Sequence, residues 1–90
     1  MTHRTPDDLR PFLERALPLL RHQYLVERVA EFMVTGTARM VPYGPGETPW
    51  KHYERLDFCV HSALRAVADR TLNASHFHGL AHAFSLLDRQ

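Results

Sequence analysis

The 90-residue chain has a single cysteine and almost no charge imbalance, and each shortage argues against a class of protein. Cys59 has no partner for an internal disulfide, which predicts a reducing, cytoplasmic environment. Eleven Lys and Arg residues against ten Asp and Glu residues give a net charge of +1, and no segment concentrates the basic residues. The chain therefore lacks the basic stripe that binding to a phosphate backbone requires, which argues against nucleic acid as a partner.

Long apolar runs are also missing from the sequence. No stretch approaches the roughly 20 apolar residues that cross a bilayer, and the first residues lack the apolar core of a signal peptide. Hydrophobic residues make up 44% of the chain and charged residues 23%, as in ordinary soluble domains. We therefore expect a single helical domain over residues 1–90 in the cytoplasm, with no membrane attachment.

Apolar residues recur at helical spacing in four segments, which favours helices over strands. The segments run from Thr5 to about 17, from about 18 to 34, from about 48 to 70, and from about 75 to 88. Thr-Pro pairs open the first and third segments, as at many helix starts. Three of the four glycines fall within Thr35–Thr48. The sequence predicts an all-α fold, a small bundle of three to four helices with one long Pro/Gly-containing central loop over Thr35–Thr48.

The apolar stripe changes sides after Pro18. Before this proline it follows Leu9 and Leu13, whereas after it the stripe lies on nearly the opposite side. A break at Pro18 would let both pieces fold toward one core. A straight helix would instead leave the second stripe uncovered by the chain's own fold. That second interpretation predicts a docking surface made of Leu25, Val29, Phe32 and Met33.

Two aromatic residues of the third segment also suggest contact with a partner. Phe58 lies almost opposite the centre of the apolar stripe, and Trp50 begins an aromatic and basic cluster that continues to Arg55. Such clusters occur at protein hot spots and on surfaces that stack bases, and the absence of surplus positive charge favours protein. We predict a small non-enzymatic protein-binding or regulatory module that acts as a homodimer. Its predicted partner-binding residues are Leu25, Val29, Phe32, Met33, Trp50 and Phe58.

The seven histidines suggest a metal-binding module as an alternative. His78 and His82 are four residues apart, so one face of a helix could present both to an ion, and His76 comes just before them. No Cys, Asp or Glu stands nearby at ligand spacing, and a structural zinc site needs about four ligands. The leading interpretation therefore has no metal and no cofactor, and His76, His78 and His82 are the residues of the alternative.

Arg70 and His76 suggest a second alternative. Five residues separate them across a junction between two helices, and this element resembles the Arg-to-His element of HEPN-type ribonucleases. The resemblance implies a small α-helical dimer in which Arg70 and His76, paired across the dimer, cleave RNA. It covers only these two positions. Thr71 follows the arginine where the family usually has Asn, Asp or His, and the chain is short for that family.

No segment carries another recognisable reaction signature. Asp57 and His61 lie four residues apart in the third segment, and an Asp that orients a His belongs to hydrolytic triads. No nucleophile in a Gly-x-Ser-x-Gly elbow accompanies them, and Cys59 points elsewhere on the helix. We therefore expect this pair to stabilise its helix rather than to catalyse a reaction.

Overall fold

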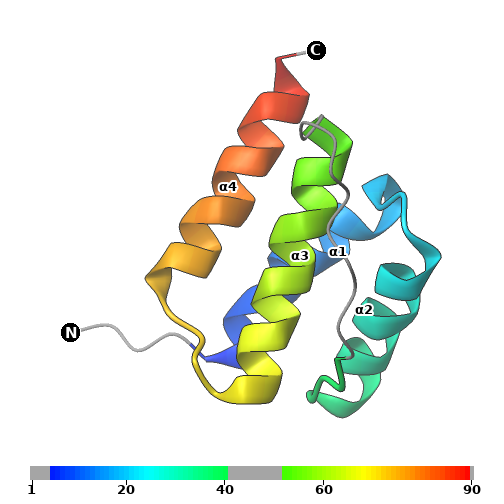
Figure 1. Cartoon of the computed structure of the whole chain (residues 1–90), viewed down its shortest axis with the longest axis vertical. Coiled ribbons are helices and arrows are strands. Elements are labelled where there is room, and N and C mark those ends of the chain that lie inside the picture. The colour runs from blue at the N-terminus through cyan, green and yellow to red at the C-terminus, as the bar shows by residue number, and fades with distance from the viewer. Residues whose placement is uncertain (1–4, 41–51, 90) are drawn as a thin grey trace.

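The computed structural model describes residues 5–40 and 52–89. Its elements are η1 (Pro6–Leu9), α1 (Arg10–Ala16), η2 (Leu17–Leu19), α2 (Gln23–Thr35), α3 (His52–Asp69) and α4 (Ala74–Asp88). The described ranges contain no strand, so the predicted all-α bundle is confirmed. Figure 1 shows α3 in the centre, α4 along one side of it, α2 along the other, and α1 crossing behind. Residues 41–51, with most of the predicted central loop and Trp50, lie outside the described part.

The chain breaks at the proline where the apolar stripe changes sides. Pro18 lies in the 3-10 turn η2, and the backbone is extended at Leu20 and His22 before α2 begins at Gln23. A proline inside a helix lacks the N–H donor and clashes with the preceding turn, which accounts for this break. The prediction of a helix starting near Pro18 is therefore wrong by about five residues.

The break allows both apolar stripes to face one core. Leu9 and Leu13 lie before it and Leu25, Val29 and Phe32 after it, and all five side chains are 0% exposed. The prediction that the second stripe docks a partner is therefore wrong for Leu25, Val29 and Phe32. Met33 is half-buried and packs against this core, so most of its side chain does not form an open docking surface either.

The last two helices complete the core as their spacing predicts. From α3 and α4 the buried apolar side chains are Leu56, Val60, Ala63, Leu64, Ala66, Phe77, Leu80, Ala83 and Phe84. Asn73 caps α4, because its side chain accepts a hydrogen bond from the backbone N–H of Ser75 at 2.8 Å. None of the helices in the described ranges combines the length and the apolar character that crossing a bilayer requires.

Candidate protein interface

Phe58 projects from the outer side of α3, and 43% of its surface is exposed. Within residues 5–40 and 52–89, Val34 is the other large apolar side chain on the surface. Single exposed apolar residues are common, so exposure alone does not define an interface. What distinguishes Phe58 is the surface beside it.

A hollow of about 160 Å³ lies next to Phe58, in the surface between α3 and α4. We call it the Phe58 hollow, and its lining residues are Phe58, Cys59, Ser62, Ser75, His76 and Gly79. A cavity of roughly 150 Å³ is known to accept one benzene molecule. The Phe58 hollow therefore has the volume to receive one aromatic ring.

Gly79 leaves this space open. A Cβ atom placed on Gly79 would lie 3.7 Å from Sγ of Cys59, which is an ordinary van der Waals contact. The packing of α3 against α4 therefore does not require glycine at this position. Glycine inside a helix costs about 1 kcal/mol relative to alanine. Gly79 therefore leaves the hollow open and makes α4 less stable than alanine would.

Replacing Gly79 with alanine should raise the free energy of unfolding by about 0.5–1 kcal/mol, because alanine is the better helix former and its methyl group fits. Urea unfolding followed by circular dichroism measures the change. If the variant instead loses stability by that amount, the added methyl group does not fit, and α3 and α4 lie closer together at Gly79 than the structure shows.

His76 is held in place by the cap of α4. Its ring Nδ1 accepts a hydrogen bond from the backbone N–H of Asn73 at 3.1 Å. Together with the Asn73 side chain this forms a reciprocal capping box, which satisfies N–H groups that the first helical turn leaves unpaired. His76 thus forms one wall of the Phe58 hollow and has a structural role there.

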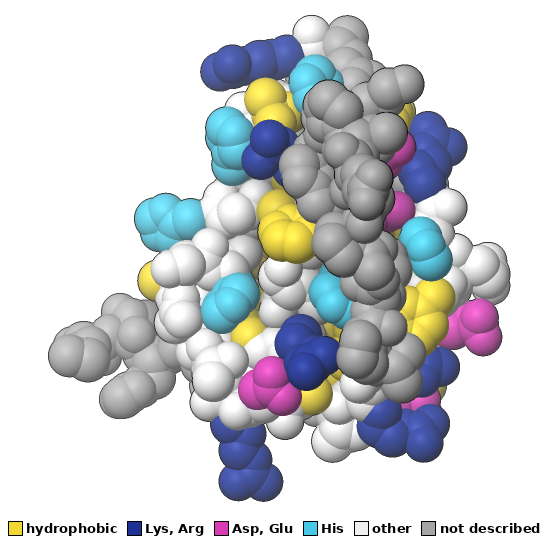
Figure 2. Space-filling view, viewed as in Figure 1, with side chains coloured by type: hydrophobic (Ala, Val, Ile, Leu, Met, Phe, Trp, Pro, Cys, Tyr) yellow, Lys and Arg dark blue, Asp and Glu magenta, His cyan; other side chains and the backbone are white. Residues whose placement is uncertain are grey.

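Figure 2 shows several histidine side chains and separate hydrophobic side chains on one face of the molecule. In the described part of the chain, however, no three His, Cys, Asp or Glu side chains come together in a way that could hold a metal ion. His78 and His82 are exposed, and Nδ1 of His76 is engaged in the cap of α4. The described residues therefore do not assemble His76, His78 and His82 into the metal site of the alternative interpretation.

Arg70 and His76 line different hollows. His76 borders the Phe58 hollow, whereas Arg70 borders a second hollow at the end of α3, with Pro6 and Leu72. The ribonuclease alternative requires this Arg and His to act on one substrate. Within one subunit the structure does not bring them into one site.

Asp57 is a buried charged residue, 5% exposed, whose position was not evident from the sequence pattern. Its Oδ1 accepts a hydrogen bond from the backbone N–H of Arg21 at 3.1 Å, which ties the link before α2 to α3. The guanidinium of Arg21 also lies 4.0 Å from the centroid of the Tyr53 ring. Burial raises the pKa of Asp57, although the Arg21 N–H and the nearby charge of His22 act in the opposite direction.

Asp57 therefore makes stability depend on pH. Between its ordinary pKa of 3.8 and the raised pKa of the folded state, the folded chain binds more protons than the unfolded chain. Protonation of Asp57 therefore stabilises the folded state. This contribution is fully present below pH 3.8 and is lost as the pH rises through the pKa of Asp57 in the folded chain. Asp57→Asn never ionises and keeps an oxygen acceptor for Arg21. We expect the variant to be more stable than the wild type at pH 7, with the difference shrinking below pH 4.

Urea unfolding of both chains at pH 7 and pH 4 measures this difference. Burial lowers the pKa of His61, which costs stability as the pH falls below its ordinary value of 6.5. His61 is present in both chains, so comparing them isolates Asp57. A variant less stable than the wild type at pH 7 would mean that the ionised carboxylate stabilises the fold.

Comparisons of the chain with models of protein families, with curated proteins and with solved structures find no match. Its function is therefore inferred from its own surface chemistry. The Phe58 hollow is the feature that combines an exposed aromatic side chain with a space of matching size.

Proposed function

We propose that this protein is a small non-enzymatic cytoplasmic module that acts by binding a second copy of itself through the Phe58 hollow. The observation that carries the proposal is an exposed aromatic ring next to a hollow of one-ring volume on the same surface. A surface with both a knob and a hole can bind its own copy. Of the predicted partner-binding residues, Phe58 carries this proposal.

A two-fold axis beside the hollow would pair the two copies. In such an interface residue i contacts residue j and residue j contacts residue i, so each Phe58 enters the hollow of the other copy. Complete burial of a phenylalanine side chain contributes roughly 1.5–3 kcal/mol. Phe58 is 43% exposed in the free chain, so docking adds only part of this for each ring, and the symmetric contact is made twice. Gly79 helps this fit, because no side chain at that position blocks the hollow.

The small net charge of the chain permits close approach of two copies. Further along α3, Arg65 and Asp69 form an ion pair at 3.1 Å, so these two charges neutralise each other. The net charge of the whole chain is +1, which leaves little long-range repulsion between copies. The lining itself includes the polar side chains of Ser62, Ser75 and His76, and polar groups are common around protein–protein interfaces.

Sedimentation equilibrium over a concentration series tests the proposal. A self-associating chain should show a mass approaching twice 10.4 kDa at high concentration and falling toward 10.4 kDa on dilution. A mass of 10.4 kDa at every concentration up to the millimolar range would contradict it.

A further inference from the structure

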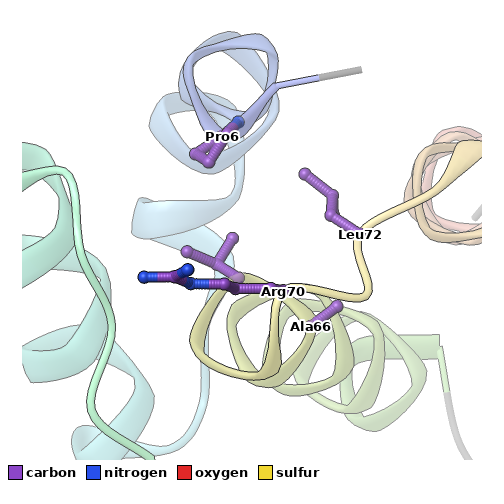
Figure 3. Close-up of a pocket in the computed structure, with 5 residues that line it drawn as sticks. Pro6, Ala66, Arg70 and Leu72 are labelled. Carbon is purple, nitrogen blue, oxygen red and sulfur yellow. The ribbon is translucent and has the colours of Figure 1, made fainter. Parts of the chain in front are cut away.

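A second hollow, of about 210 Å³, lies at the end of α3 on a different part of the surface. We call it the Arg70 hollow, and its lining residues are Pro6, Ala66, Val67, Arg70 and Leu72. In Figure 3 the Leu72 side chain points toward Pro6 across the hollow, and the Arg70 side chain runs along its edge. The walls are thus aliphatic, and one guanidinium supplies the only charge on the lining.

The backbone holds Arg70 in an unusual conformation. Arg70 has φ 61°, and it is the non-glycine residue with positive φ among the described residues. The N–H of Thr71 donates to the carbonyl of Ala66 at 2.8 Å, and the N–H of Arg70 donates to that of Val67 at 3.3 Å. This is the Schellman arrangement, in which glycine normally occupies the left-handed position. Arginine there is less stable than glycine, so a role for its side chain would account for its presence.

The Arg70 charge has no counterion in the described part of the chain. Arg15 pairs with Asp88 at 3.1 Å and Arg65 with Asp69 at 3.1 Å, whereas no acidic side chain of the described ranges lies within ion-pair distance of Arg70. A guanidinium presents a planar fork of donors that matches a carboxylate with two parallel hydrogen bonds. Its partner can therefore come from outside the chain.

We propose that the Arg70 hollow binds a small aliphatic carboxylate. The carboxylate pairs with the Arg70 guanidinium, and the alkyl part packs against Pro6, Val67 and Leu72. A phosphate also suits a guanidinium, but it would bring strongly hydrated oxygens against these aliphatic walls without hydrogen-bond partners. This site is separate from the Phe58 hollow, since the two share no lining residue. It therefore does not depend on self-association.

Titration of ¹⁵N-labelled protein with 4-methylpentanoate tests the proposal by NMR. We expect saturable shifts of the amides of Ala66, Arg70, Thr71 and Leu72, with a dissociation constant of the order of millimolar for so small a ligand. The uncharged amide, 4-methylpentanamide, lacks the carboxylate, and inorganic phosphate lacks the alkyl group. Each should bind at least about tenfold more weakly, because each loses one of the two contacts. Equal binding of either probe, or no saturable shift, would overturn the proposal.

Two variants separate ligand binding from folding. Arg70→Gly places the favoured residue at positive φ, so its melting temperature should equal or exceed that of the wild type while the affinity for 4-methylpentanoate falls at least about tenfold. Arg89→Gln removes the same charge near the end of α4 and should leave the affinity unchanged. Retained binding by Arg70→Gly, or an equal loss in Arg89→Gln, would overturn the assignment.

Discussion

Replacing Phe32 with alanine is expected to lower the free energy of unfolding by about 3–5 kcal/mol. Phe32 is 0% exposed and belongs to the core that joins the two apolar stripes. The guanidinium of Arg10 lies 5.4 Å from the centroid of its ring and donates a hydrogen bond to the carbonyl of Met33 at 2.9 Å. The substitution removes the ring, leaves a cavity, and weakens the attachment of α1 to the end of α2. Small domains are stable by about 5–15 kcal/mol, so much of the fold's stability depends on this residue.

Urea unfolding followed by circular dichroism measures this loss. Val34→Ala is the matched control, because Val34 lies two residues away on α2 but is 86% exposed. We expect the control to stay within about 0.5 kcal/mol of the wild type. Wild-type stability of Phe32→Ala, combined with weaker self-association, would instead mean that α2 presents this side chain to a partner.

Replacing Phe58 with glutamate is expected to weaken self-association by at least about 100-fold. Each Phe58 is 43% exposed in the free chain, so a symmetric dimer loses for each ring only part of the roughly 1.5–3 kcal/mol that complete burial contributes. Each 1.4 kcal/mol is a tenfold change in the association constant. The substitution also places two carboxylates in an interface without counterions, which adds to the loss. Phe58 lies on the surface, so helix content should be unchanged.

Sedimentation equilibrium of matched variants tests this prediction. Val34→Glu introduces the same charge at another exposed apolar position, on α2, and should associate like the wild type. Gly79→Leu fills the hollow and should also abolish association. Ala81→Leu places the same side chain on an exposed position of α4, away from the hollow, and should have no effect. If Phe58→Glu and Gly79→Leu associate as strongly as the wild type, the contact between copies lies elsewhere on the surface.

Most of the helical architecture follows from local rules that can be read in the sequence. The Thr5-Pro6 start and the apolar spacing of α3 and α4 match the structure. The start of α2 does not match, because the extended link after Pro18 runs as far as His22. Whether the second apolar stripe joins one core or stays exposed depends on the direction of the chain after Pro18. The spacing of apolar residues does not specify this direction.

The surface features depend on tertiary packing and were therefore harder to predict. Phe58 was found because it lies opposite the apolar stripe, but the hollow beside it forms only where α3 meets α4. The isolated Gly79 within a helical pattern was the available signal for that hollow. Asp57 is buried by contact with a segment 36 residues away in the sequence, and no spacing rule indicates that contact. The positive φ of Arg70 is likewise unexpected for a residue other than glycine.

Isotope-filtered NMR on a mixture of labelled and unlabelled chains tests most directly whether a second copy occupies the Phe58 hollow. Proton contacts between the two kinds of chain report only on the interface. We expect contacts from the ring of Phe58 in one copy to Gly79 and Ser75 of the other, since these residues line the hollow. Contacts between copies that exclude Phe58, or none at a concentration where the mass is dimeric, would contradict the proposed docking surface.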